Sequence, residues 1–179
     1  MTLLLKQKIK LYNRVLFKSG AILGLFLFGC AAPQVVYKKG TSVAVWDIEN
    51  LSPKKAGPSD ISEFLSDKVA ATIKEKGYYN IVERQRLLLV LNELNLGTST
   101  LVDEATGLQL GRMVGARLMV FGGYLVFADQ MRLDLRLVDV ETGGVIKTAE
   151  KTVSATELAG WLKAAEAAAN ELFMDRLAK

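Results

Sequence analysis

The stretch from residue 131 to residue 137 alternates without interruption between apolar and charged side chains. Its apolar positions are Met131, Leu133, Leu135 and Leu137, and its charged positions are Arg132, Asp134 and Arg136. Because successive residues of a strand point to opposite faces, this pattern predicts a strand with one buried face and one polar face. A sheet that contains such a strand needs helices to cover its apolar side.

The rest of the chain supplies those helices and further strands. Helices are predicted where apolar residues recur every three or four positions, at residues 61–77, 87–97, 103–115 and 156–177. Strands are predicted where β-branched and apolar residues cluster, at residues 42–49, 78–83, 118–127 and 145–153. The resulting order, β-α-β-α-α-β-β-β-α, predicts an α/β fold in which helices pack on a mixed, largely antiparallel sheet of about five strands.

Small and polar residues mark the ends of several elements. Ser59 or Asp60 is expected to cap the first helix, and Gly77 is expected to end it. Gly122-Gly123 interrupts the third strand and indicates either a β-bulge or a close approach of two backbones. Residues 141–144, Glu-Thr-Gly-Gly, are predicted to form a hairpin turn.

The first 29 residues have the layout of a signal peptide. Five basic residues and no acidic residue precede an apolar run that ends at Gly29, and the only cysteine of the chain, Cys30, follows directly. The apolar run is shorter than the roughly 20 residues that a membrane-spanning helix needs. A permanent transmembrane helix is therefore the weaker interpretation.

The segment Leu27-Phe28-Gly29-Cys30 resembles the lipobox of bacterial lipoproteins. The resemblance implies that the cysteine sulfur receives a diacylglyceryl group, that the chain is cut before Cys30 and that the new amine is acylated. The alternative is that Cys30 is an apolar residue of an ordinary secretory signal. Ala31-Ala32, with no Asp, follows the cysteine, and similarity to lipoprotein sorting signals then favours the periplasmic face of the outer membrane.

Three segments are therefore expected along the chain. Residues 1–29 form a signal peptide, residues 30–40 contain the lipidated cysteine and a short tether, and residues 41–179 form one α/β domain. About 140 residues are enough for one compact domain.

The composition excludes several classes of function. The chain has no His and one Cys, so it has no means of building a His/Cys zinc site, a Ser-His-Asp triad or an internal disulfide. Five of its 23 basic residues lie in residues 1–29, which leaves 18 basic against 19 acidic residues in the remainder. We therefore expect no enzyme activity, no cofactor or metal, no nucleic-acid partner and no small-molecule substrate.

Two pairs of carboxylates are candidates for catalytic or metal sites. Asp47 and Glu49 are interpreted as an acidic strand end within a polar network. Asp103 and Glu104 are interpreted as residues that cap a helix and interact favourably with the helix dipole. Neither pair has a convergent partner in the sequence, so no catalytic site is predicted.

A candidate docking surface comes from the polar positions of the last strands. Its residues, provided that the strand register places them on one face, are Arg132, Asp134, Arg136, Lys147 and Lys151. One interpretation is a solvated sheet face. The other is a surface that binds a partner protein or a neighbouring subunit, a task for which Arg is well suited.

Four segments, taken in order, carry a family resemblance. They are residues 43–50 (VAVWDIEN), 81–87 (IVERQRL), 115–122 (GARLMVFG) and 135–143 (LRLVDVETG). Together they resemble the periplasmic domain of the CsgG superfamily, which includes the curli secretion channel lipoprotein and, more distantly, the penicillin-binding-protein activator lipoprotein LpoB. The resemblance implies an α/β lipoprotein domain that works in the cell envelope.

The departures from the family pattern bear on function. Only Ala128-Asp129-Gln130 separate two strands where the curli channel inserts a long membrane hairpin, and residues 51–58 lack the aromatic residues of its constriction loop. We therefore expect a non-enzymatic assembly or accessory factor, anchored to the membrane by lipid and bound to an envelope protein or to copies of itself in a ring. The alternative is a subunit of an oligomeric curli-type outer-membrane secretion channel.

Overall fold

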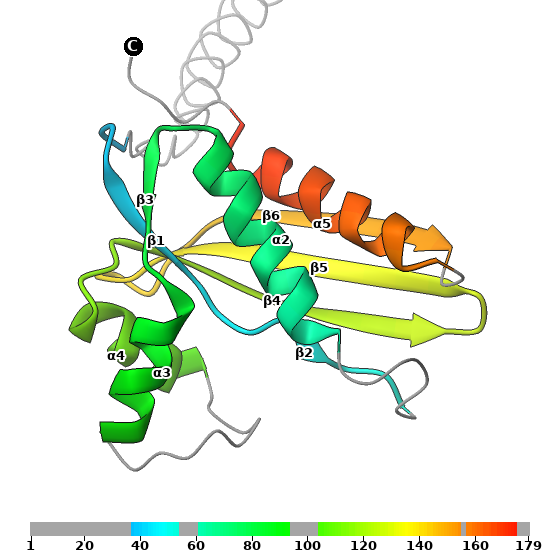
Figure 1. The fold of residues 1–179 in the computed structure, drawn as a ribbon, viewed down its shortest axis with the longest axis horizontal. Helices are drawn as coiled ribbons and strands as arrows, with labels where there is room; N and C mark the ends of the chain where they lie inside the picture. Colours follow the sequence, from blue (N-terminus) through cyan, green and yellow to red (C-terminus); the bar gives the residue numbers. More distant parts are fainter. Residues whose placement is uncertain (1–36, 54–60, 94–103, 155–156, 175–179) are drawn as a thin grey trace, which may run out of the picture. The chain divides into compact units, whose positions relative to one another are not determined.

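The computed structural model divides the chain into two compact units, residues 1–35 and residues 36–179. The structure describes residues 37–53, 61–93, 104–154 and 157–174, all of which belong to the second unit (Figure 1). The predicted signal peptide, Cys30 and the predicted capping residues Ser59, Asp60 and Asp103 lie outside the described residues.

The element order confirms the α/β prediction and adds one short strand. The elements are β1 (Thr41–Val45), β2 (Glu49–Asn50), α2 (Ser62–Glu75), β3 (Tyr79–Ile81), α3 (Arg84–Glu93), α4 (Glu104–Met113), β4 (Leu118–Phe127), β5 (Gln130–Asp139), β6 (Val145–Ser154) and α5 (Leu158–Leu172). Gly77 and Gly115 follow α2 and α4 with φ of 68° and 74°, a left-handed conformation that glycine adopts at little cost. Among the described residues, no helix is both long and apolar enough to cross a membrane.

The sheet is mixed and runs in the order β3-β1-β4-β5-β6. The short strands β3 and β1 lie parallel to each other, and β1 and β2 both pair with β4 in parallel. Strands β4, β5 and β6, of ten residues each, form an antiparallel meander. The antiparallel half is thus the long part of the sheet, as the sequence predicts.

The first predicted strand is broken in two by an extra residue. Val45 pairs with Val120 and Glu49 pairs with Gly123, so four steps along the first strand match three steps along β4. The break turns Ile48 into the core, where its N–H donates to Ser66 Oγ at 3.0 Å. The bulge that the sequence indicated at Gly122-Gly123 therefore lies in the neighbouring strand.

The second reading of Gly122, a close backbone approach, is confirmed. Gly122 and Gly123 pair regularly with Leu135 and Asp134 of β5. A Cβ at Gly122 would lie 2.5 Å from Leu135 Cδ2 and 2.7 Å from the carbonyl oxygen of Asp134. Only glycine fits between these atoms without a shift of the backbone.

Helices α2 and α5 cover one face of the sheet, which we call the closed face (Figure 1). The alternating apolar residues of β5 point to this side, and Leu133 and Met131 have no exposed surface. The alanines of α5, among them Ala165 and Ala169, let that helix approach the strands closely. Trp161 lies in the same core, as the sequence predicts.

Helices α3 and α4 pack on the opposite face, but only at one end of the sheet (Figure 1). Their core is smaller; its buried members are Ala44, Leu87, Val114, Ala116, Met119, Phe121, Val138 and Val140. Trp46, predicted to be a core residue, is partly buried against it. Beyond Phe121 and Val138, no described helix lies on this face.

Candidate docking face

The strand register places three of the predicted docking residues on the side of the sheet that α2 and α5 do not cover. Arg132, Asp134 and Arg136 alternate with the buried Leu133 and Leu135, and the structure confirms this alternation. On β6, Glu150 pairs with Asp134 in the register, so its side chain projects to the same side. We call this part of the sheet the open face; it consists of Arg132, Asp134, Arg136, Thr148, Glu150 and Thr152.

The other two predicted docking residues belong to the closed face. Lys147 pairs with Leu137 and Lys151 pairs with Leu133, so both lysines project toward the helices α2 and α5. Lys151 forms an ion pair with Glu171 of α5. The five residues therefore do not share one face, because directly paired residues of an antiparallel ladder point to the same side.

The charges of the open face are arranged in pairs. Arg132 Nη2 lies 2.8 Å from Asp134 Oδ1 and 2.9 Å from Glu150 Oε2. The hydrogen bond with Asp134, and then the charges of Asp134 and Glu150, raise the pKa of Arg132 above its ordinary value. Arg136 Nη2 lies 2.9 Å from Glu104 Oε2 and so connects the open face to the first turn of α4.

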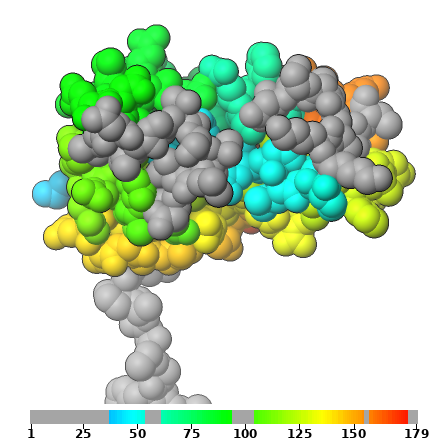
Figure 2. All heavy atoms as spheres, turned by 90° about the horizontal axis from the view of Figure 1, so that it is seen from below, coloured from blue at the N-terminus to red at the C-terminus, as the bar shows by residue number. Residues whose placement is uncertain are grey.

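A groove of about 430 Å³ runs along the border between the open face and β2. Its apolar lining includes Trp46, Leu51 and Phe121, and its charged lining is Glu49, Glu104, Asp134 and Arg136. Gly123 has no side chain to fill the space between Glu49 and Asp134, and the exposed side chain of Leu51 lies over it. In Figure 2 the cyan segment around β2 lies between the green helices and the lime β4–β5 hairpin.

The open face and its groove have the features of a binding surface. Carboxylates outnumber the two arginines, and each arginine already holds a carboxylate at hydrogen-bond distance. Paired charges beside exposed apolar atoms of Leu51 resemble the mixed lining of a protein interface. Among the described residues, no group of three His, Cys, Asp or Glu side chains is placed to hold a metal ion.

Two of the carboxylates considered in the sequence, Asp47 and Glu104, form ion pairs with arginines. Asp47 receives the Arg84 guanidinium, whose Nη2 donates to Oδ2 at 3.1 Å, and Arg84 also pairs with Glu63. Glu49 is exposed at the groove, and Glu104 pairs with Arg136.

A buried carboxylate that the sequence did not single out organises the end of the sheet. Asp139 Oδ1 accepts the N–H groups of Glu141 and Thr142 at 3.0 Å each, and Oδ2 accepts Arg117 Nη2 at 2.8 Å and the Tyr37 hydroxyl at 3.2 Å. Burial acts to raise the pKa of Asp139, but the Thr142 N–H, the Arg117 charge, the Tyr37 hydroxyl and the Glu141 N–H outweigh it and lower the pKa. The only feature of the sequence that pointed to this cluster was the predicted turn at residues 141–144.

Tyr37 belongs to this cluster and to the core. The sequence placed Tyr37 in the tether, whereas the structure buries all but 5% of its surface in the core of the closed face. The folded part of the chain thus begins at least four residues before the predicted boundary at residue 41.

A comparison with protein-family models agrees with this architecture. The model of the family described as the curli production assembly/transport component CsgG matches residues 32–132. Among curated proteins, no sequence matches this chain closely enough to be called a relative.

Solved structures of three proteins share the fold. The C-terminal domain of LpoB from Escherichia coli is 18% identical, with a TM-score of 0.56 over 66% of this chain and 85% of that chain. Lipoprotein GNA1162 from Neisseria meningitidis is 17% identical, with a TM-score of 0.55 over 75% of this chain and 98% of that chain. The PelC dodecamer from Paraburkholderia phytofirmans is 17% identical, with a TM-score of 0.51 over 82% of this chain and 94% of that chain.

Proposed function

This chain belongs to the CsgG family, and from that premise we propose that it is a non-enzymatic, lipid-anchored envelope protein that acts by binding other proteins. It serves as an assembly or accessory factor in secretion, surface-structure biogenesis or cell-wall control. The observation that carries this proposal is the open face, where Arg132, Asp134 and Arg136 lie beside a groove and no described helix covers Arg132 or Asp134.

The anchor is part of the same proposal. Residues 1–29 are a signal peptide, Cys30 carries the lipid, and residues 31–36 connect it to a domain that includes Tyr37 and is held on the periplasmic face of the outer membrane. One similar structure is named a lipoprotein, which supports the anchor. The family's transport and assembly description and the LpoB likeness support a place in the envelope.

Mass spectrometry of the protein extracted from membranes tests the anchor. The expected result is a mature chain that begins at an acylated Cys30, and a Cys30→Ser variant that is neither cleaved nor membrane-bound. An unmodified Cys30, or equal membrane binding by the serine variant, would contradict it.

Crosslinking in intact envelopes tests the open face. Arg132→Glu combined with Arg136→Glu is expected to abolish the crosslinked complexes, because both new carboxylates would face Asp134, Glu150 and Glu104. The matched control is Arg86→Glu combined with Lys163→Glu, which makes the same charge change at exposed positions of α3 and α5. Unchanged complexes in a folded open-face variant would remove this face as the docking surface.

The partner is either another envelope protein or a second copy of this chain. The dodecameric state in which PelC was solved supports self-association as one form of the proposal. The alternative function is a subunit of an oligomeric secretion channel of the curli type. Planar-bilayer recordings of the mature lipoprotein distinguish the two, since discrete conductance steps favour the channel and their absence under conditions where complexes form favours the accessory role.

A further inference from the structure

The end of the domain at which the described chain begins is exposed and basic. Residues 38–41 form a tight turn, closed by the Thr41 N–H, which donates to the Lys38 carbonyl at 3.1 Å. Lys38 and Lys39 are exposed on this turn. The Gly40 N–H donates to the Tyr78 carbonyl at 2.7 Å, so the segment with Lys76 and the exposed Tyr78 lies beside it.

Two arginines extend this end along the sheet. The Arg117 N–H donates to the Ser42 carbonyl at 3.0 Å, and Ser42 Oγ donates to the Gly115 carbonyl at 2.7 Å, so Arg117 follows directly from the turn. A shallow pocket of about 310 Å³ lies here; its lining is Arg112, Gly115, Ala116, Arg117, Val140 and Glu141. Arg112 is exposed and uses Nε to bond the Val140 carbonyl at 3.1 Å.

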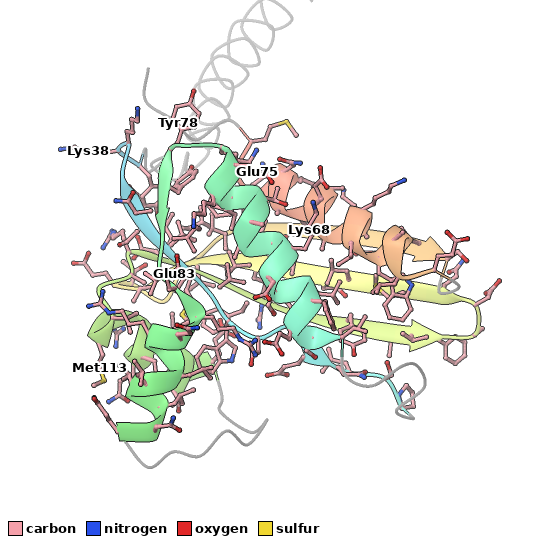
Figure 3. All side chains as sticks on the ribbon, viewed as in Figure 1. Lys38, Lys68, Glu75, Tyr78, Glu83 and Met113 are labelled. Carbon is pink, nitrogen blue, oxygen red and sulfur yellow. The ribbon has the colours of Figure 1, made fainter. Side chains whose placement is uncertain are left out.

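We call this surface the basic end; it consists of Lys38, Lys39, Lys76, Tyr78, Arg112, Met113 and Arg117. Its five basic residues face three carboxylates, Glu75, Asp139 and Glu141, of which Asp139 and Glu141 are held by Arg117. Tyr78 and Met113 add exposed apolar surface, 45% and 50% of each residue. In Figure 3, Lys38 and Tyr78 project outward at the upper left of the ribbon, and Met113 does so at its lower left.

The other end of the sheet has the opposite character. The described residues of β2, the β4–β5 turn and the start of α5 include Glu49, Asp129 and Glu157. Strand β4 connects the two ends, and its ten residues span about 30 Å. Among the described residues, the basic end thus carries more basic than acidic side chains, whereas these three positions toward the opposite end are acidic.

The length of chain before the basic end limits its distance from a membrane. Six residues separate Cys30 from Tyr37, which is fixed in the core, and the seven Cα–Cα steps between the two span about 25 Å at most. Once Cys30 is anchored, Tyr37 and the basic end beside it stay within reach of the lipid headgroups. Electrostatic attraction acts over about 10 Å at moderate salt, so contact or near contact is enough for it to orient the domain.

We propose that the basic end docks on the anionic surface of the membrane that holds the protein. This inference rests on the anchoring proposed above. Lys38, Lys39 and Lys76 lie against headgroup phosphates, Arg112 receives a headgroup at the mouth of its pocket, and Tyr78 enters the interfacial layer. Docking fixes the orientation of the domain, and the acidic end is directed away from the lipid.

The test uses the chain from Cys30 to Lys179, which contains the whole compact unit. Its only cysteine, Cys30, is coupled to a maleimide phospholipid in vesicles of phosphatidylcholine alone, or in vesicles where phosphatidylglycerol replaces part of it. Lysines are acylated by a short pulse of reagent, and mass spectrometry compares Lys38 and Lys39 with Lys163, which is exposed on α5. Because the coupling supplies the anchor, the result does not depend on whether the cell lipidates Cys30.

The expected result is that phosphatidylglycerol slows acylation of Lys38 and Lys39 at least about threefold while Lys163 is unaffected. Raised salt should remove the difference. Arg112→Glu should weaken the protection, and Arg86→Glu, the same change at an exposed position of α3, should not. Equal acylation rates of Lys38 and Lys39 in the two vesicle types would overturn the proposal. An equal loss of protection in Arg112→Glu and Arg86→Glu would also overturn it.

Discussion

The closed face and the open face belong to the same strands but depend on different interactions. On β5, Leu133 and Leu135 are buried beneath α2 and α5, whereas Arg132 and Asp134, their neighbours in the chain, are about half exposed. The closed face contributes apolar burial, and the open face contributes ion pairs that exchange readily with water. The comparison teaches that one alternating strand stabilises the fold with one side and leaves the other side available for binding.

The sharpest test of this difference replaces adjacent residues of β5. Leu133→Ala removes a fully buried side chain and leaves a cavity under α5, so we expect a loss of about 3 kcal/mol in the free energy of unfolding, measured in urea. Arg132→Ala should unfold at the same urea concentration as the parent, because its ion pairs are exposed. Equal losses at both positions would show that the open face is covered in solution.

Adding a single methyl group at Gly122 or at Gly123 compares the two faces of β4. Gly122→Ala places a methyl group 2.7 Å from the Asp134 carbonyl oxygen, and we expect a loss of about 2 kcal/mol in the free energy of unfolding. Gly123→Ala meets only the side chain of Leu51 at close range, and Leu51 is 58% exposed and free to move aside. Gly123→Ala should therefore lower the free energy of unfolding by less than about 1 kcal/mol. Thermal unfolding of the two variants compares the two losses. A larger loss at Gly123 would contradict this assignment.

Asp139 lies buried where the closed face meets the end of the sheet, and its stabilisation should depend on pH. Because folding lowers its pKa below the ordinary value of about 3.9, its contribution is present above about pH 4 and is lost as the pH falls below that. Asp139→Asn should cost about 1–2 kcal/mol at pH 7 and flatten the decline of stability below pH 5.

Urea unfolding across this pH range measures the effect of Asp139→Asn. Asp134→Asn, at an exposed carboxylate of the open face, is the control and should change the free energy of unfolding at pH 7 by less than about 0.5 kcal/mol. An unaltered pH profile in Asp139→Asn would exclude Asp139 as the group that titrates.

A small effect is expected for the ion pair that connects the open face to α4. Arg136→Ala should cost about 0.5 kcal/mol, since both side chains of the Arg136–Glu104 pair are partly exposed. A double-mutant cycle with Glu104→Ala isolates the pair. A coupling energy well above about 1 kcal/mol would mean that this pair, rather than apolar contact, holds α4 at the open face.

Much of the fold followed from periodicity alone. The alternation at residues 131–137 predicted both faces of β5, and the change from a helical to a strand period near residue 117 predicted the long meander. The open-face positions Arg132, Asp134 and Arg136 were predicted for the same reason. These predictions are local, and the period of side-chain direction is fixed by the strand itself.

What the sequence missed depends on contacts between distant segments. Lys147 and Lys151 were assigned to the wrong face because β6 slips at Leu137/Val138, which is visible only in the register with β5. The bulge was assigned to Gly122-Gly123, although the extra residue lies in the partner strand near Ile48. Asp139 gave little signal, because its two side-chain donors come from Tyr37 and Arg117, 102 and 22 residues away.

The position of β1 inside the sheet has a mechanical consequence. A tensile load that enters the folded domain from its amino end reaches Tyr37 first, where the Asp139 hydrogen bond and the core resist it. The load then meets β1, which is hydrogen-bonded on one side to β3 and on the other to β4. Pulling β1 out requires both ladders to shear together, whereas an edge strand would unzip one bond at a time. A domain that is held by its amino end therefore resists unfolding under tension, because the force acts first on a strand that is paired on both sides.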